Sequence, residues 1–340
     1  MALRGDCYFV VPGDLDTPTG GYRYDRHIVM GLQASGWRVE VVSLQGSFPW
    51  PQPQALYSVQ QQLKALPDRA LVVIDGLAFG ALPQLAHAHA QRLRWVALVH
   101  HPLWLETGLD AAQQAQLRHS EAWALQAARQ VIVTSAATAG DVRALVGPDL
   151  PVAVVEPGTD PVIARARTAA GHDAKTPRVL CVASLTPRKG HGVLLEALAG
   201  LQHLPWSLHN VGSASRHPAT AQGLLSACAA LGLGQRVFWH GEVDDTALTA
   251  HYAAADLFVL PSWHEGYGMA VAEALAHGLP VVASHAGALA QTLPCAAGRQ
   301  VAPGDVLALR NALAELIGHP STRRACAAAA REAGARLPTW

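Results

Sequence analysis

Two glutamates bracket a glycine-rich turn in HEGYGMAVAEALAHGLPVVAS, residues 264–284. Glu265 precedes the turn GYG (266–268), and Glu273 follows eight residues after Glu265. We expect a helix to begin at Met269, where amides without helical partners favour an anion. A carboxylate repels a phosphate, so we expect these two to hold neutral diols, one on a sugar and one on a ribose. The pattern therefore predicts a site for a nucleotide-diphosphate sugar; the alternative is two exposed glutamates without a role.

A lysine follows a second predicted strand, in the segment VASLTPRKGHGVLLEALA (182–199). Lys189 is expected to reach a diphosphate from the opposite wall of a cleft. There its charge would stabilise a leaving group, an effect often worth about 10²–10³ in rate. The alternative is a solvated surface lysine, although the chain has only three lysines.

Adjacent histidines close another predicted strand, in VHHPLWLE (99–106). His100 and His101 point in different directions if the strand continues through them, which argues against a shared metal ion. A structural His-Pro turn is the alternative reading of this segment. Glu106 is a candidate for orienting one of the histidines or for contacting an acceptor.

The loop after the first predicted strand reads PTGGYRYDRHIV (18–29). Gly20 and Gly21 would let the backbone approach phosphates or a sugar, although an ordinary strand-to-helix turn explains them equally well. The segment lacks G-x-G-x-x-G, which argues against a dinucleotide-dependent dehydrogenase. The nearby Asp14-Leu15-Asp16 has the spacing of a metal-binding Asp-x-Asp motif, but we interpret it as a solvated turn.

Short apolar runs alternate with helix-like segments, which is typical of parallel α/β sheets. Helices are expected near 21–35, 191–203, 218–231, 245–255 and 269–277, with two more in 305–336. Strands are expected at 7–11, 37–44, 71–75, 94–100, 130–135, 152–156, 178–185, 206–212, 236–241, 257–262 and 280–284. In such sheets, ligands bind at the carboxyl ends of the strands.

The 340 residues predict two doubly wound α/β domains of similar size with a cleft between them. We expect an N-terminal acceptor-side domain over 1–160 and a linker over 161–177. A nucleotide-sugar domain would follow over 178–320, and a C-terminal helix over 321–340 would pack back on the N-terminal domain.

Composition excludes several classes of function. Half of the residues are apolar and 15% are charged, so little of the chain is expected to be disordered. Residues 1–160 carry 11 basic and 14 acidic residues, a net of −3, and the remainder carries a net of +3. This balance argues against a nucleic-acid or anionic-membrane partner. Five scattered cysteines and the lack of a long apolar run predict a cytoplasmic protein without disulfides.

The Glu265-x7-Glu273 motif and its flanks closely resemble the signature of family 4 retaining glycosyltransferases of the GT-B fold, and the resemblance covers nearly the whole chain. It implies two facing Rossmann-like domains, a nucleotide-sugar donor and no divalent metal or other cofactor. The catalytic residues by this resemblance are Glu265, Lys189 and His100. The donor-binding residues are Gly20, Gly21, Arg188, Gly266, Tyr267, Gly268, Met269, Ala270 and Glu273, and the acceptor residues are His101, Glu106 and Tyr22.

One position departs from the family pattern. An arginine is usual five residues before the lysine, and here Ser184 occupies that position. Arg188 is the candidate for the missing cation. The departure leaves the geometry of the diphosphate clamp open.

The expected activity is transfer of a hexose, with retention and without a metal, to a hydroxyl of a small molecule or saccharide. The alternatives are a nucleotide-sugar epimerase or phosphorylase on the same fold, and a catalytically idle nucleotide-sugar-binding protein.

Overall fold

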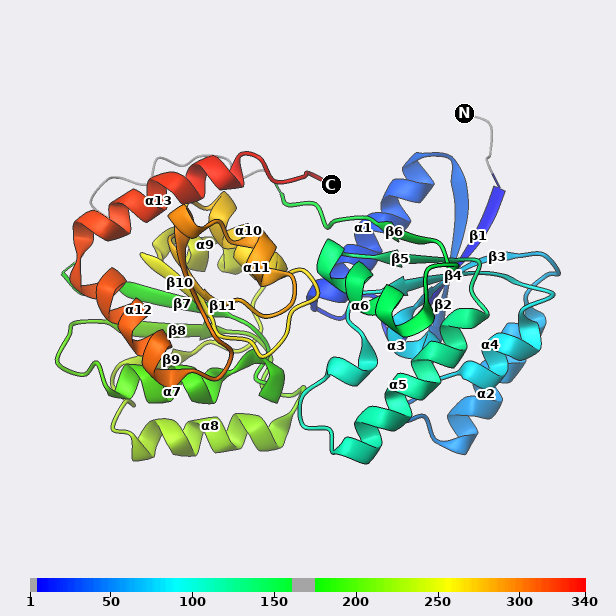
Figure 1. The fold of residues 1–340 in the computed structure, drawn as a ribbon, viewed down its shortest axis with the longest axis horizontal. Helices are drawn as coiled ribbons and strands as arrows, with labels where there is room; N and C mark the ends of the chain where they lie inside the picture. Colours follow the sequence, from blue (N-terminus) through cyan, green and yellow to red (C-terminus); the bar gives the residue numbers. More distant parts are fainter. Residues whose placement is uncertain (1–4, 161–174) are drawn as a thin grey trace. The chain divides into compact units, whose positions relative to one another are not determined.

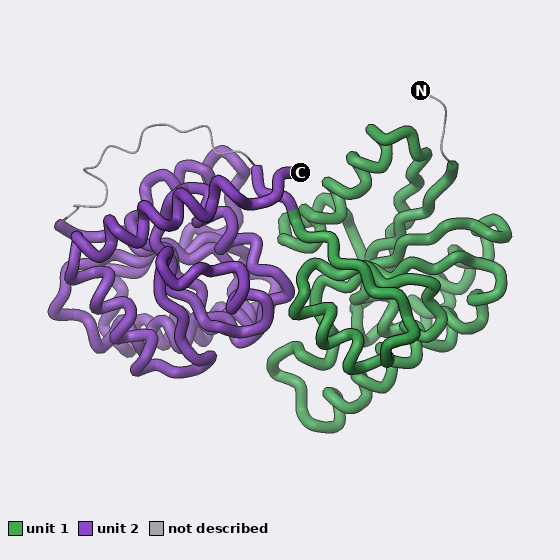
Figure 2. Tube along the Cα trace, turned by 45° about the horizontal axis from the view of Figure 1, so that its top comes forward, with its two compact units in different colours: residues 1–157 green, residues 158–340 purple. Residues whose placement is uncertain are grey.

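The computed structural model of the chain describes residues 5–160 and 175–340. The chain divides into two compact units, residues 1–157 (unit 1) and residues 158–340 (unit 2), coloured separately in Figure 2. Each unit has its own sheet and its own core. The linker expected at residues 161–177 falls mostly on 161–174, which lie outside the described residues.

Unit 1 is built on a parallel sheet of six strands in the order β2-β1-β3-β4-β5-β6 (Figure 1). The chain goes from β1 to β2 on one side and then to β3 on the other. The direction of winding therefore reverses beside β1, which is where a doubly wound sheet binds its ligand. The strands are β1 (Gly5–Pro12), β2 (Trp37–Leu44), β3 (Leu71–Asp75), β4 (Arg94–Val99), β5 (Gln130–Val133) and β6 (Val152–Val154).

Helices cover both faces of this sheet because alternate side chains of each strand point to opposite faces. Phe9 and Val11 of β1 pack in one core with Tyr24 of the first helix, while Val10 belongs to the core on the other face. The helices are α1 (Gly20–Ala34), α2 (Pro53–Ala65), α3 (Gly76–Phe79), α4 (Pro83–His89), the 3-10 turn η1 (Leu103–Leu105), α5 (Ala111–Gln126) and α6 (Ala136–Val146).

Unit 2 repeats the arrangement with a parallel sheet in the order β12-β11-β10-β7-β8-β9. Here the winding reverses between β7 and β10, which are neighbours in space. Every residue of β10 and β11 is buried, as expected for strands covered on both faces. The strands are β7 (Arg178–Val182), β8 (Ser207–Val211), β9 (Val237–Trp239), β10 (Leu257–Leu260), β11 (Val281–Ser284) and β12 (Gly298–Val301).

The helices of unit 2 follow the strands in turn. The C-terminal helix packs on the helix that begins at Met269 and on the helix before it, all within unit 2. The helices and 3-10 turns of unit 2 are η3 (Pro187–Lys189), α7 (His191–Ala199), α8 (Pro218–Ala230), α9 (Asp245–Ala254), α10 (Met269–Ala276), α11 (Leu289–Thr292), η4 (Cys295–Ala297), α12 (Val306–Gly318) and α13 (Pro320–Gly334). No helix among the described residues is both long enough and apolar enough to cross a membrane.

The eleven strands expected from the sequence are all present within a few residues of their predicted ends. The sequence analysis missed β12, whose residues GRQV include no apolar run. Helix α10 begins at Met269 as predicted and ends one residue earlier than expected. The predicted pair of helices over 305–336 corresponds to α12 and α13.

A buried glutamate fixes the turn that follows the predicted histidine pair. Glu121 of α5 is 1% exposed, and its Oε2 accepts a hydrogen bond of 3.0 Å from the Leu103 amide of η1. Burial raises the pKa of Glu121 to about 8, although the amide hydrogen bond opposes this effect. The folded protein therefore retains this proton at neutral pH, whereas the unfolded chain releases it above about pH 4.5.

We predict that Glu121→Gln removes a pH dependence of stability. Because the folded-state pKa is raised, the glutamate stabilises the fold fully below about pH 4.5, and this contribution is lost as the pH rises to about 8. The variant should match the wild type at the acidic end and exceed it above about pH 8, by about 2–4 °C in Tm for each kcal/mol gained. Thermal unfolding against pH measures this, with the exposed Glu156→Gln as control. A variant that is less stable than the wild type above about pH 8 would contradict the prediction.

Candidate functional site

Two loops of unit 2 meet where the winding of its sheet reverses. One follows β7 and contains η3, and the other follows β10 and leads into α10. Gly190, with φ of +69°, lies so close to the Pro261 carbonyl that a side chain at this position would overlap it. This close approach of the two backbones brings Lys189 beside Glu265.

Glu265 is buried and lies at the centre of this junction. Its Oε1 accepts hydrogen bonds of 2.6 Å from Lys189 Nζ and from Ser262 Oγ. Its Oε2 lies 3.6 Å from Arg188 Nη1. One carboxylate is thus shared by two cations.

Burial alone would raise the pKa of Glu265, but Lys189 and Arg188 outweigh it and lower the pKa to about 2. The carboxylate is therefore ionised at any ordinary pH. Because the folded-state pKa is lowered, its stabilising contribution is complete above about pH 4.5 and is lost as the pH falls toward about 2.

The positively polarised end of α10 starts four residues after Glu265, at Met269. Gly268 precedes it with φ of +89°, and any side chain there would collide with Leu289. The N-cap residue is Gly268, which has no side chain to cap the first amides of α10, at Met269 and Ala270. Such amides attract an anion, as the sequence predicted for this turn. Within the same turn, Tyr267 is buried and its carbonyl accepts a hydrogen bond of 2.9 Å from Thr292 Oγ1.

The second predicted glutamate has a fixed orientation of its own. Glu273 lies one turn into α10, and its Oε2 accepts a hydrogen bond of 2.8 Å from the Tyr252 hydroxyl of α9. The Tyr252 ring in turn stacks on His277 at 4.9 Å between centroids. The sequence analysis did not identify Tyr252 or Ser262, because neither belongs to a spacing pattern that marks it as a partner of a glutamate.

Arg188 takes part in the cluster even though Ser184 replaces the usual arginine. Its Nη1 donates a hydrogen bond of 2.9 Å to the His264 carbonyl, next to Glu265. The guanidinium therefore points toward the loop after β10. The structure thus places a second cation at the site, from a position four residues later in the chain.

In unit 1, the predicted residues gather at the carboxyl ends of β1 and β4. Gly20 and Gly21 begin α1, and the Thr19 side chain caps that helix by accepting from the Tyr22 amide at 3.2 Å. Gly21 lies against the His100 ring. The Tyr22 hydroxyl donates to the Pro12 carbonyl at the end of β1.

Two aspartates that the sequence analysis did not single out surround His100. Its Nε2 lies 2.9 Å from Asp25 Oδ1 and 3.9 Å from Asp75 Oδ2. Among the residues that the structure describes, these three form the only set of His, Cys, Asp or Glu side chains whose ligand atoms lie within 4.8 Å of one another. That spacing would also suit a cation, but the direct hydrogen bond between His100 and Asp25 accounts for it.

His101 and Glu106 lie together beside η1. Their Nε2 and Oε2 atoms are 3.8 Å apart, so Glu106 is close enough to orient this histidine rather than His100. Asp14 and Asp16 are exposed, and Asp14 Oδ1 accepts from the Asp16 amide at 2.9 Å. The Asp-x-Asp segment is thus the solvated turn that we predicted.

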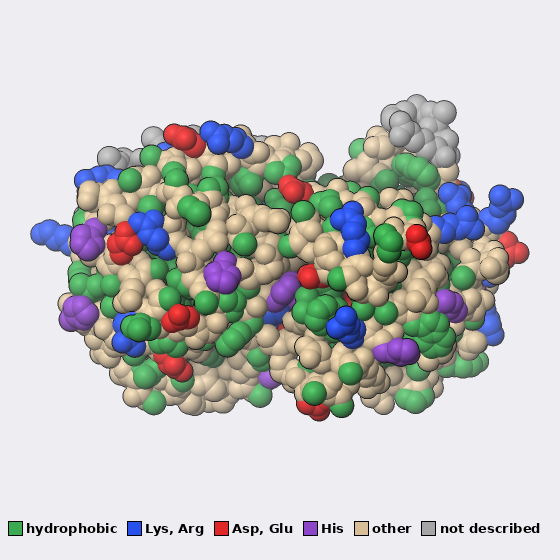
Figure 3. All heavy atoms as spheres, in the orientation of Figure 1, with side chains coloured by type: hydrophobic (Ala, Val, Ile, Leu, Met, Phe, Trp, Pro, Cys, Tyr) green, Lys and Arg blue, Asp and Glu red, His purple; other side chains and the backbone are tan. Residues whose placement is uncertain are grey.

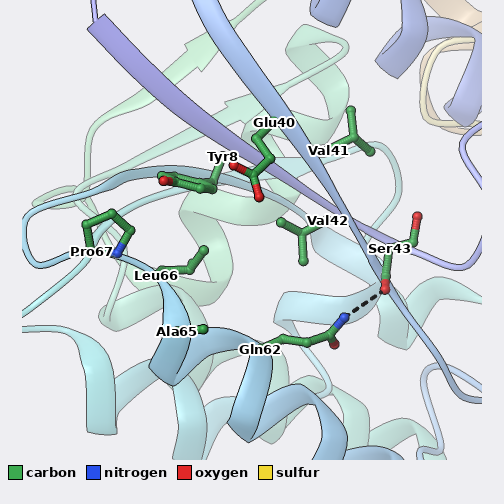
Figure 4. Close-up of a pocket in the computed structure, with 9 residues that line it drawn as sticks. All are labelled: Tyr8, Glu40, Val41, Val42, Ser43, Gln62, Ala65, Leu66 and Pro67. Atoms are coloured by element: carbon green, nitrogen blue, oxygen red, sulfur yellow. Dashed lines mark hydrogen bonds between the residues drawn. The ribbon is translucent and has the colours of Figure 1, made fainter.

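A cavity of about 550 Å³ lies elsewhere in unit 1, between the edge strand β2 and α2 (Figure 4). None of the predicted site residues lines it. Its walls include Val42 and Leu66, and Gln62 Nε2 donates a hydrogen bond of 3.1 Å to the Ser43 carbonyl. This cavity is therefore separate from the candidate site, which we identify from its converging charged groups.

The face of the molecule drawn in Figure 3 shows acidic and basic side chains interspersed on each unit. No continuous basic stripe is visible on that face. This pattern agrees with the balanced charge of the sequence.

The family model and the two relatives that follow are all described as glycosyltransferases. The sequence model described as "Glycosyl transferases group 1" matches residues 176–319. The chain is 34% identical to a D-inositol 3-phosphate glycosyltransferase of Xylanimonas cellulosilytica over 61% of its own length and 53% of the relative. It is 30% identical to the lipopolysaccharide core biosynthesis mannosyltransferase LpcC of Rhizobium leguminosarum bv. viciae, over 68% of each chain. The chain thus spans about half to two thirds of these relatives.

Solved structures share the fold over nearly the whole chain. Sucrose-phosphate synthase from Thermosynechococcus elongatus superposes with a TM-score of 0.83 at 24% identity, covering 99% of this chain and 96% of that one. Anabaena HepE, solved in complex with UDP and glucose, gives a TM-score of 0.73 at 22% identity, covering 98% and 95%. The two sheets and their helices therefore have the architecture of these proteins.

We predict that Lys189 and Glu265 are energetically coupled. Lys189→Met leaves the buried carboxylate with Arg188 as its remaining cation, and should lower the free energy of unfolding by about 1–3 kcal/mol. Adding Glu265→Gln should recover part of that loss, giving a coupling energy of at least about 1 kcal/mol. Urea denaturation of the two single variants and the double variant measures it.

Lys64→Met is the matched control, because Lys64 lies exposed on α2 and should change stability by less than about 0.5 kcal/mol. Additive effects of the two site substitutions would contradict the ion pair.

Proposed function

Because the chain belongs to the group 1 glycosyltransferases, the GT4 family with the GT-B fold, we propose that it transfers a sugar from a nucleotide-diphosphate sugar to a hydroxyl acceptor. The transfer retains the configuration at the anomeric carbon and moves a hexose. One observation carries the proposal: Glu265 is held by Lys189, Arg188 and Ser262 just before the uncapped start of α10.

The charges of this cluster suit a diphosphate. Lys189 and Arg188 both lie beside the Glu265 carboxylate, and we assign these two cations to the phosphates. The amides of Met269 and Ala270 add a partial positive charge from the helix. These groups do the work that a divalent metal does on diphosphates elsewhere, so we expect no metal requirement.

The reaction needs positioning and electrostatics more than a protein nucleophile. The acceptor oxygen forms a bond to the anomeric carbon while the bond from that carbon to the diphosphate oxygen breaks. The acceptor's proton leaves with the departing nucleoside diphosphate. Lys189 and Arg188 stabilise the negative charge that develops on that group, and Glu265 binds hydroxyls of the sugar.

We assign the ribose to Glu273. The Tyr252 hydroxyl donates a hydrogen bond to one oxygen of this carboxylate, which restrains its orientation for binding a diol. The nucleoside would then lie on the far side of the turn from the sugar. In unit 1, we assign Gly20, Gly21 and His100 to the donor phosphates and sugar.

The acceptor is a small molecule or a saccharide, and we place it near Tyr22, His101 and Glu106 of unit 1. The names of relatives specify candidate donors and acceptors. A 33% identical protein of Mycolicibacterium smegmatis is GDP-mannose-dependent, and HepE has been solved with UDP-glucose. GDP-mannose and UDP-glucose are therefore the first donors to test.

Rival functions differ in their products. An epimerase changes the sugar of the donor without an acceptor, and a phosphorylase requires free phosphate. An idle binding protein holds the donor and releases nothing. Release of nucleoside diphosphate that depends on an acceptor distinguishes transfer from all three.

We predict that Glu265→Gln lowers kcat by about 10²-fold or more, since its carboxylate orients both the sugar and Lys189. Acceptor-dependent release of nucleoside diphosphate measures this, with thermal unfolding to show that the variant is folded. Glu332→Gln, on the exposed face of α13, is the matched control and should leave kcat unchanged. A kcat near that of the wild type in Glu265→Gln would contradict the assignment of Glu265 to the donor sugar.

We also predict that Glu273→Gln separates ribose binding from phosphate binding. The Kd for the nucleoside diphosphate should rise about 10-fold, equivalent to about 1.4 kcal/mol, because a charged hydrogen bond to the ribose is lost. The Kd for inorganic pyrophosphate, which has no ribose, should not change. Calorimetric titration of both ligands measures the two values, and an equal weakening of both would contradict this role.

A further inference from the structure

A hydrogen bond and an aromatic contact hold the His100 ring in place. Its Nε2 donates to Asp25 Oδ1 at 2.9 Å, and Tyr24 packs edge-on against its ring, with centroids 5.3 Å apart and planes at 84°. Gly21 lies beside the same ring, where an added Cβ would be in van der Waals contact with it. The ring is therefore fixed in one orientation, with its side chain 20% exposed.

The two aspartates come from elements that only the sheet order brings together. Asp25 lies in the second turn of α1, and Asp75 ends β3 beside β4, the strand that His100 directly follows. Asp25 is fully buried, and its Oδ2 has no hydrogen-bond partner within the described parts of the chain. A buried carboxylate with one bare oxygen depends on a nearby positive charge for its stability.

The positive charge beside Asp25 is that of His100 itself, whose protonated form is favoured by the groups around it. Burial lowers the pKa of His100, but the charge of Asp25, its hydrogen bond and the charge of Asp75 together raise it to about 9. Burial and the charge of Asp25 raise the pKa of Asp75 to about 7, while His100 opposes the rise. From the other neighbouring elements, Thr134 reaches the His100 carbonyl with its hydroxyl at 3.4 Å.

We propose that Asp25 and Asp75 are positioning residues that hold His100 as an imidazolium, so that its Nδ1–H acts in the transfer reaction as a charged hydrogen-bond donor and not as a base. Nε2 is taken by Asp25, so Nδ1 is the ring nitrogen left for a ligand, and in an imidazolium both nitrogens donate. The inference rests on the proposed function, in which His100 contacts the donor or the acceptor.

This charge state determines what His100 binds and where the acceptor's proton goes. A donor N–H recognises an oxygen that accepts, such as a sugar hydroxyl oxygen or a phosphate oxygen. It cannot take the proton of the attacking hydroxyl. In the proposed reaction that proton passes to the departing diphosphate.

The charge of His100 is measured without any activity, by NMR titration of protein labelled at histidine. The chain has 17 histidines, and His100→Gln identifies the signal that belongs to this one. We expect the wild type to keep the His100 proton up to about pH 9. In Asp25→Asn, which keeps an oxygen for the hydrogen bond but removes the charge, the proton should leave about 1–3 pH units lower.

Asp68→Asn is the matched control, because this aspartate is exposed and pairs with Arg92 away from the cluster. Asp75→Asn should lower the pH at which His100 loses its proton by a smaller amount than Asp25→Asn does. Asparagine can still cap α3, as Asp75 does by accepting a hydrogen bond from the Leu77 amide. The same titrations with and without EDTA test for a cation. A His100 signal that titrates below about pH 7 in the wild type, or one that shifts on adding EDTA, would overturn the proposal.

The rate of transfer against pH tests the role of the charge. The ratio of kcat in Asp25→Asn to kcat in the wild type should lie between about one half and one near pH 6 and fall about 3-fold or more by pH 8.5, as the variant's histidine loses its proton. A ratio that stays constant or rises with pH would refute the donor role, since a base gains activity on deprotonation. Absence of transfer by the wild type with every donor would instead refute the proposed function and leave the titration result intact.

Discussion

The ion pair between Lys189 and Glu265 is the interaction on which the candidate site depends. It joins the loop after β7 to the loop after β10, two strands that are neighbours only because the winding of the sheet reverses between them. Burying the carboxylate is unfavourable unless cations compensate it, so the fold keeps Lys189 and Arg188 at this place even without a ligand. A cluster that is already cationic and already rigid then needs little rearrangement to receive a diphosphate.

Unit 1 shows the same principle with the charges inverted. Around His100, two buried aspartates lie beside one imidazole, whereas around Glu265 two cations lie beside one carboxylate. Both clusters lie where strands end beside a reversal of winding, because that is where side chains from distant segments converge. Each central group is thereby kept in one charge state, which suits electrostatic catalysis better than proton transfer by the protein.

The sequence predicted what depends on local pattern. The glycines on either side of Tyr267 and the glutamate spacing located the start of α10, and the apolar runs located all strands except β12, whose four residues carry no such run. It did not predict Asp25 or Asp75, which stand 50 residues apart and meet only through the sheet order. Nor did it predict that Lys189 would bind Glu265 directly, since the approach depends on the contact of Gly190 with Pro261.

The most direct test of the central claim is a crystal structure with the nucleoside diphosphate that stabilises the protein. The account predicts diphosphate oxygens within hydrogen-bond distance of the Met269 and Ala270 amides, with Lys189 or Arg188 in contact with them and the ribose on Glu273. A diphosphate bound away from the start of α10, with Lys189 and Glu265 undisturbed and far from any ligand atom, would contradict it.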